Sequence, residues 1–270
     1  MSISRYFQIV FVTGALLVNA SVTSYASLES EGVDARALPQ PDALPAPLRS
    51  ELPVRPRPEC VISMVAHHPT SLTGIDVSHY QGNINWQDVA SDANVRFVYI
   101  KATEGSSLKD SHLRRNLQGA RSAGLPVGIY HFFSPTAPVK EQLANFLSTS
   151  REHQQDLIPI VDVEKRGRQS LDTFHRRLHE FLLQVERAYG VKPIIYTYMN
   201  FYNRYMVGQY APYKFMIASY SEDVPELIDN PQMVLWQFTA EGNVEGVHTH
   251  VDRSRFMDHY SLPDILLPSK

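Results

Sequence analysis

Two carboxylates, Asp162 and Glu164, lie two residues apart at the end of a near-continuous apolar run that begins at Leu157. Strand side chains alternate in direction, so residues two apart point the same way, roughly 6.5–7 Å apart along the strand. Carboxylates at this separation repel, and at least one is expected to have a raised pKa unless cations compensate. Glycoside hydrolysis is typically catalysed by one protonated carboxylic acid beside one ionised carboxylate.

Other polar residues follow the apolar cores of other predicted strands. They are Asp76, Lys101, Glu104, His131, Tyr196, Gln237 and Asp252. In a parallel barrel, the C-terminal strand ends and their loops form the active-site face. Each of these residues taken singly could equally cap a loop or form an ion pair. Charged side chains are seldom buried without partners, so the set as a whole predicts a functional cleft.

The elements that must position these residues alternate between strand and helix patterns. Strands are predicted at 95–100, 127–132, 157–163, 193–197, 215–218 and 234–238, and helices at 112–123, from Pro138 onward, and at 171–190. Repeating βα units of this kind predict an α/β fold with a parallel sheet. Periodicity does not separate an open sheet from a closed barrel.

Composition narrows the classes of function. Of the 270 residues, 43% are hydrophobic and 20% are charged, as in an ordinary soluble globular protein. The net charge of −3 gives no basis for nucleic-acid binding. A single cysteine, Cys60, excludes intramolecular disulfides and multi-cysteine metal sites. No phosphate-binding glycine motif occurs. We therefore expect chemistry based on oxygen and nitrogen groups.

The N-terminus has the three-part layout of a secretory signal peptide. Arg5 precedes the apolar run 9–18, and Ser24-Tyr25-Ala26 offers small residues for cleavage after Ala26. The run is shorter than the roughly 20 apolar residues that a transmembrane helix needs. We expect residues 1–26 to direct export to the periplasm or the medium, with a retained N-terminal anchor as the alternative.

Proline content sets the expected domain boundaries. Eight of the 18 prolines lie between Pro39 and Pro69, which predicts a disordered linker over 27–70. Pro263 and Pro268 close the other end. We therefore expect a single folded body over 71–262, followed by a C-terminal tail over 263–270.

Several motifs resemble those of the glycoside hydrolase family 25 lysozymes, in the family's order. They are Gly74-Ile75-Asp76-Val77-Ser78 with Gln81-Gly82, Ile84 and Trp86; Lys101-Ala102-Thr103-Glu104-Gly105; Gly128-Ile129-Tyr130-His131-Phe132; Asp162-Val163-Glu164; Pro193-Ile194-Ile195-Tyr196-Thr197; Trp236-Gln237; and Val251-Asp252. The resemblance covers nearly all of 74–256. It implies a TIM-barrel-like β/α barrel with fewer helices than a full eight-fold barrel. It also implies cleavage of the β-1,4 bond between N-acetylmuramic acid and N-acetylglucosamine in peptidoglycan.

The resemblance also implies roles for individual residues. Glu164 matches the general acid, and Asp162 the carboxylate that stabilises charge or orients the substrate's acetamido group. Asp76 and Asp252 match two further acidic residues of the cleft. The implied substrate contacts are Tyr130, Tyr196, Trp236, Gln237 and His131, although His131 could equally be a structural, hydrogen-bonded histidine. No cofactor and no metal ion is implied.

Each of three other motifs could bind a ligand or could simply be solvent-exposed or part of a loop. His175 and His179 could share a metal, but a solvated helix face is favoured. His248 and His250 could also bind a metal ion together, but a loop without a metal ion is the favoured interpretation. The basic run Lys165-Arg166-Gly167-Arg168 could meet the anionic groups of peptidoglycan or simply solvent.

Two alternatives to a lysozyme are considered. One is a catalytically silent barrel that binds cell-wall glycans. The other is a chitinase-like N-acetylglucosaminidase, whose longer D-x-x-D-x-D-x-E pattern is absent. We expect peptidoglycan glycan strands as the partner, no nucleic acid, no membrane contact beyond the export signal, and a monomer.

Overall fold

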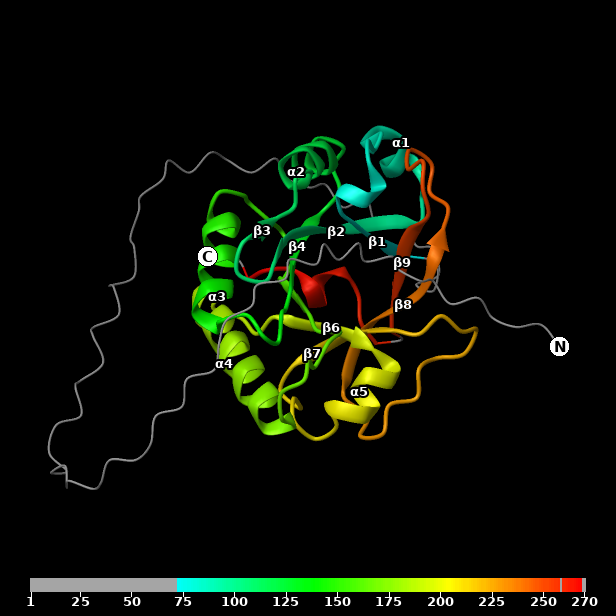
Figure 1. The fold of residues 1–270 in the computed structure, drawn as a ribbon. Helices are drawn as coiled ribbons and strands as arrows, with labels where there is room; N and C mark the ends of the chain where they lie inside the picture. Colours follow the sequence, from blue (N-terminus) through cyan, green and yellow to red (C-terminus); the bar gives the residue numbers. More distant parts are fainter. Residues whose placement is uncertain (1–71, 258, 269–270) are drawn as a thin grey trace, which may run out of the picture. The chain divides into compact units, whose positions relative to one another are not determined.

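A closed β-barrel dominates the computed structural model, which describes residues 72–257 and 259–268 (Figure 1). In these residues nine strands form one sheet, and all but β3 make up the barrel. The strands are β1 (Thr73–Val77), β2 (Val95–Glu104), β3 (Leu108–Lys109), β4 (Val127–Phe132), β5 (Ile160–Asp162), β6 (Ile194–Tyr198), β7 (Lys214–Ala218), β8 (Gln232–Gly242) and β9 (Val251–Phe256). The predicted signal peptide (1–26) and linker (27–70) lie outside the described residues.

Strand direction is parallel around most of the barrel. From β1 through β2, β4, β5, β6 and β7 to β8, each neighbouring pair is parallel. The last strand, β9, runs antiparallel to both β8 and β1 and closes the ring. The short β3 pairs only with the end of β2.

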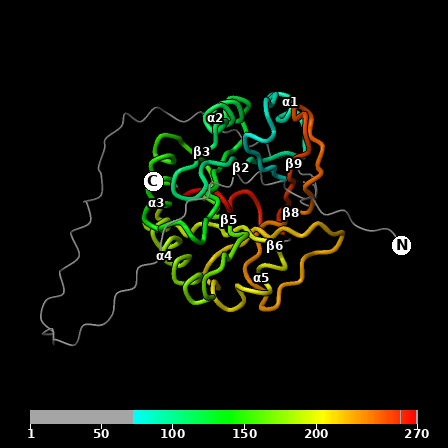
Figure 2. The backbone as a smooth tube through the Cα atoms, viewed as in Figure 1, coloured from blue at the N-terminus to red at the C-terminus, as the bar shows by residue number. Residues whose placement is uncertain are grey.

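Few helices accompany these strands, as the predicted fold requires. They are α1 (Trp86–Ser91), α2 (Leu113–Ser122), α3 (Val139–Arg151), α4 (Leu171–Tyr189) and α5 (Met199–Tyr205), with 3-10 turns η2 (His79–Gln81) and η3 (Leu262–Ile265). The longest, α4, begins where the Ser170 side chain accepts a hydrogen bond from the Thr173 N–H, and ends at Gly190 in a left-handed conformation. The predicted fold class, a β/α barrel with fewer than eight helices, is confirmed. Figure 2 traces the same path along the backbone.

Strand alternation divides the buried residues into two cores. Ile75 and Val161 belong to the core between the barrel and its helices. Their neighbours on the strands point inward, where Phe97, Tyr99 and Ile160 are among the residues that fill the barrel. Glycine is required at two inward positions: a Cβ on Gly74 would lie 2.1 Å from the Phe97 ring, and one on Gly128 would lie 2.4 Å from the Tyr99 ring.

The C-terminal segment closes the bottom of the barrel, so the expectation of a tail beginning at 263 is wrong. Ile265 is fully buried, and its carbonyl accepts a hydrogen bond from the Ile158 N–H at 2.8 Å. Leu266 forms a β-bridge with Leu157. Pro263 does not end the fold because it lies in the first turn of η3, where a missing N–H is tolerated. The packed body thus continues beyond residue 262.

Among the described residues, no helix combines the length and the apolar character needed to cross a membrane.

Candidate active site

Four carboxylates lie at the mouth formed by the C-terminal ends of the parallel strands. Asp76 is on β1, Asp162 is the last residue of β5, and Glu164 follows two residues later. Asp252 is on β9 and is paired in register with Asp76. Because β9 runs in the opposite direction, its first residues reach the mouth at which the other strands end. The structure thus places the four predicted acidic residues at one end of the barrel.

Burial is the main cause of the altered acidity of these groups. It raises the pKa of Asp76, Asp162 and Glu164, and it raises the pKa of Asp252 to about 6. Mutual repulsion adds to the effect: the charge of Asp252 raises the pKa of Asp76, and that of Glu164 raises the pKa of Asp162. The cluster therefore retains protons at a higher pH than isolated carboxyl groups would, as general acid catalysis requires.

One oxygen of Asp162 is buried without a partner. Within the described residues, no group donates a hydrogen bond to Asp162 Oδ1. A buried acceptor in this state costs free energy, and native structures contain few of them.

The Gln237 side chain connects the acidic cluster to two tyrosines. Its Nε2 donates to Asp76 Oδ1 at 3.0 Å and to Oδ2 at 3.2 Å. Its Oε1 accepts from the hydroxyls of Tyr196 and Tyr220, each at 2.9 Å. These bonds fix the orientation of the amide, and they hold Asp76 in place.

Two further tyrosines, Tyr130 and Tyr198, bear on the acidic residues. Burial raises the pKa of Tyr130, and the charges of Asp162 and Asp76 raise it further. Tyr198 is partly exposed, and its hydroxyl makes a hydrogen bond that lowers the pKa of Glu164. Tyr198 was not predicted from the sequence, although its position two residues after Tyr196 on β6 was a usable signal. Tyr220 was not predicted either, because it lies in the loop after β7 and carries no such signal.

One predicted contact, His131, does not reach the site. Its ring lies in the outer core, 4.9 Å from the Phe181 ring and 5.4 Å from the Phe146 ring. Nδ1 is 2.7 Å from Thr103 Oγ1, and Nε2 is 3.3 Å from Gln142 Oε1. Burial lowers the pKa of His131 to about 3, so the ring is neutral. His131 and Tyr130 are adjacent on β4, and alternation sends their side chains to opposite faces.

Trp236 is turned away from the acidic cluster for the same reason. It adjoins Gln237 on β8, and its Nε1 donates to the Ser219 carbonyl at 2.8 Å. The Arg255 guanidinium lies 4.1 Å above the indole ring, which is fully buried. The predicted role of Trp236 as a substrate contact is therefore not supported by this geometry.

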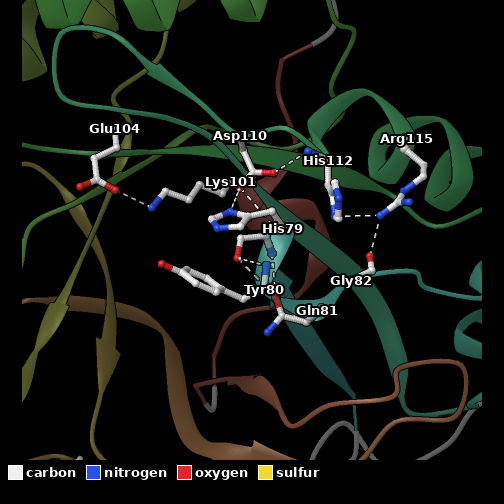
Figure 3. Close-up of polar contacts among 10 residues, drawn as sticks. His79, Tyr80, Gln81, Gly82, Lys101, Glu104, Asp110, His112 and Arg115 are labelled. Carbon is white, nitrogen blue, oxygen red and sulfur yellow. Dashed lines mark hydrogen bonds and ion pairs between the residues drawn. The ribbon is translucent and has the colours of Figure 1, made fainter. Parts of the chain in front are cut away.

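The rim near β1 and β2 carries a second set of polar contacts (Figure 3). Lys101 Nζ donates to Glu104 Oε2 at 2.7 Å, and the charge of Lys101 lowers the pKa of Asp162 and Glu164. His79 is held by Asp110, whose Oδ2 lies 3.0 Å from the His79 backbone N and 2.7 Å from its Nδ1. The neighbouring Tyr80 is 74% exposed.

The two histidine motifs have structural surroundings. His175 and His179 are half-buried rather than solvated, because both pack on Tyr210, whose hydroxyl is 2.7 Å from His175 Nδ1. Residues 248–250 form a loop, as predicted. Across 72–257 and 259–268, no three His, Cys, Asp or Glu side chains are grouped so that they could hold a metal ion.

Comparisons with known proteins identify the family to which the chain belongs. The family model "Glycosyl hydrolases family 25" matches residues 75–247. "Uncharacterized protein YegX" of Escherichia coli (strain K12) is 39% identical over 204 residues, which are 73% of this chain and 74% of that protein. "Lysozyme M1" of Streptomyces globisporus is 32% identical over 202 residues, 69% of this chain and 68% of that protein.

Solved structures show the same fold. The bacterial lysozyme from Streptomyces coelicolor superposes with a TM-score of 0.64 at 29% identity, over 73% of this chain and 96% of that one. A family 25 glycosyl hydrolase from Bacillus anthracis gives a TM-score of 0.64 at 28% identity, over 72% of this chain and 95% of that one.

Proposed function

The chain belongs to glycosyl hydrolase family 25 and is a muramidase-type glycoside hydrolase of peptidoglycan. From this premise we propose which bond the enzyme cleaves, which residues catalyse the cleavage, and where the protein acts. The scissile bond is the β-1,4 linkage between N-acetylmuramic acid and N-acetylglucosamine. Glu164 is the general acid, and Asp162 is the carboxylate that assists it. The protein acts after export.

The observation that carries this proposal is the gathering of four carboxylates with raised pKa values at one barrel mouth. Such clustering costs stability, because burial and like charges both oppose ionisation. A barrel that only bound glycans would not need an Asp162–Glu164 pair. The cost is expected where protons are transferred during a reaction.

In the proposed reaction, protonated Glu164 donates its proton to the glycosidic oxygen, and the bond to the leaving sugar breaks. Positive charge develops at the anomeric carbon as that bond breaks. Asp162 stabilises that charge or orients the substrate's acetamido group. A water molecule then adds to the anomeric carbon and returns a proton to Glu164, which completes the hydrolysis. Gln237 keeps Asp76 in position, and Asp76 and Asp252 shape the electrostatic field around the reacting carbon.

Digestion of purified peptidoglycan tests this function. Mass spectrometry should find new N-acetylmuramic acid reducing ends with the wild-type protein and none with the Asp162→Asn/Glu164→Gln double variant. New N-acetylglucosamine ends would place the enzyme in another glycosidase class. Binding without cleavage would support the silent glycan-binding barrel.

Export is proposed from the N-terminal sequence alone. Cleavage after Ala26 should give a mature chain that begins near Ser27. The intact mass of the protein recovered from the periplasm or medium measures this. Retention of residues 1–18 would favour the anchor.

A further inference from the structure

Four cationic residues on the segments that follow barrel strands β5 and β6 take no part in the proton transfer proposed above. Three of them, Lys165, Arg166 and Arg168, follow Glu164 in the loop between β5 and α4. The fourth, Arg204, is on α5. We call these four residues the basic patch.

The loop that carries the basic patch is held in place by specific contacts. Gly167 has φ +72°, a left-handed conformation that favours glycine. The Gln169 Nε2 donates to the Pro135 carbonyl at 2.9 Å, which ties the loop to the segment after β4. Arg166 donates to the Gln169 carbonyl within the loop.

An aromatic ring brings charges from two elements together. The guanidinium of Arg166 lies 5.6 Å from the centre of the Tyr205 ring, and that of Arg204 lies 5.3 Å from the same centre. Lys165 Nζ lies 5.0 Å from the centre of the Phe132 ring. Aromatic faces attract cations, but they do not neutralise the repulsion between like charges.

Protein carboxylates do not neutralise the patch in the described residues. None of the four cations is within ion-pair distance of a described Asp or Glu, and three of them lie within the four residues 165–168. The chain as a whole has a net charge of −3, so this local excess of positive charge does not reflect composition. It fits an anion that arrives with the substrate.

We propose that the basic patch binds the free carboxylates along the stem peptide that N-acetylmuramic acid carries. Where a stem is present, the lactyl carboxyl is amide-linked to it and carries no charge. This inference rests on the proposed function, which places N-acetylmuramic acid next to Glu164. Extended peptide spans about 3.3–3.6 Å per residue, so a four-residue stem reaches roughly 14 Å from the sugar. Arginine suits this role because its planar guanidinium can bind a carboxylate through two hydrogen bonds. The patch thereby favours substituted muramic acid over neutral amino sugars.

The test uses the full chain with Arg168→Gln/Arg204→Gln, which leaves Lys165 and its field on Glu164 intact. The matched control is Arg151→Gln/Arg187→Gln, two exposed arginines near the ends of α3 and α4. Each protein is assayed on native peptidoglycan and on peptidoglycan whose carboxylates have been amidated. Thermal unfolding verifies that all variants fold.

On native peptidoglycan the patch variant should lose about three- to tenfold in kcat/KM, mainly through KM, as expected for two solvent-exposed charge pairs. On the amidated polymer its ratio to wild type should return to near one, and the control should match wild type on both. Glycan strands stripped of peptide expose a lactyl carboxylate that stem-bearing muramic acid lacks. The loss should disappear on these strands, and a loss of the same size there would overturn the assignment to the stem.

Equal losses on native and amidated polymer, or no loss on either, would overturn the inference while leaving the proposed function intact. If the wild-type protein releases no muramic acid ends from native peptidoglycan, the proposed function fails first and the inference fails with it.

Discussion

Asp76 and Asp252 stand directly opposite each other across the antiparallel pair β1–β9. Like charges at such positions destabilise a sheet. Two hydrogen bonds from Gln237 to Asp76 partly offset the repulsion, but the pKa of both carboxyl groups remains raised. The barrel therefore closes on a seam that is electrostatically unfavourable at neutral pH.

Replacing Asp252 with Asn should stabilise the protein at neutral pH. Its pKa is about 6 in the folded state against an ordinary 3.8, so folding favours the protonated form. The resulting stabilisation is present below about pH 4 and is lost as the pH rises to about 6. Asp252→Asn should then raise the free energy of unfolding by about 2 kcal/mol at pH 7.5 and change it little at pH 3.5. Urea unfolding at the two pH values measures this, and an equal effect at both would contradict it.

Replacing Gln237 with Met should impair catalysis more than folding. The change keeps the volume but removes the donor to Asp76 and the acceptor for Tyr196 and Tyr220. We expect kcat/KM on peptidoglycan to fall by about 10–100-fold, the cost of misplacing groups around the reacting atoms. The control is Gln232→Met, an exposed position on the same strand. Similar losses in the two variants would show that Gln237 has no special role.

The proposed roles of Asp162 and Glu164 can be distinguished by how the rate of each variant depends on the acidity of the leaving group. Glu164→Gln keeps the shape of the side chain and loses the proton, so kcat on natural glycan should fall by about 10²–10⁴-fold. A substrate with a very acidic leaving group needs less protonation and should partly rescue this variant. Asp162→Asn should not be rescued. The opposite pattern of rescue would reverse the two roles.

The buried C-terminal turn should contribute measurably to stability. Ile265→Ala removes a fully buried side chain and should lower the free energy of unfolding by about 2–4 kcal/mol. Leu183→Ala, at a position that is 43% exposed, is the control and should change it by less than about 1 kcal/mol. Chemical denaturation gives both values. Equal effects would mean that residues after 262 add nothing to the fold.

A chain that begins at Ser71 should fold and digest peptidoglycan as well as the mature protein does. The matched family model starts at residue 75, and the proposed catalytic residues all follow it. Circular dichroism and the release of soluble fragments test this. A folded but inactive product would assign part of the site to residues 27–70.

The sequence predicted the position of the acidic residues better than the direction of their neighbours. A carboxylate at a strand end reveals itself by interrupting an apolar run, as Asp162 does. Two adjacent polar or aromatic residues on one strand cannot both face inward, yet Tyr130 and His131 were both predicted to be contacts. The same conflict affected Trp236 and Gln237. Alternation alone required one choice in each pair, and knowing which face is internal required the closed barrel.

Other errors have a different physical origin. The proline at 263 indicates a break in regular structure, but the apolar stretch 265–267 that follows it is what packs beneath the barrel. The Tyr220 hydroxyl reaches Gln237 from a loop that has no periodicity. Contacts of this kind depend on where a loop folds back, and no local pattern encodes that.

The pairing of β1 with both β2 and β9 has a consequence for how the chain acquires its structure. One edge of β1 pairs with β9, the last strand of the barrel. This edge therefore stays unpaired until almost the whole sequence has been synthesised. Such long-range pairing slows folding and leaves a sheet edge open to wrong partners. A chain crossing a membrane from its N-terminus would therefore complete its barrel only after translocation is nearly finished.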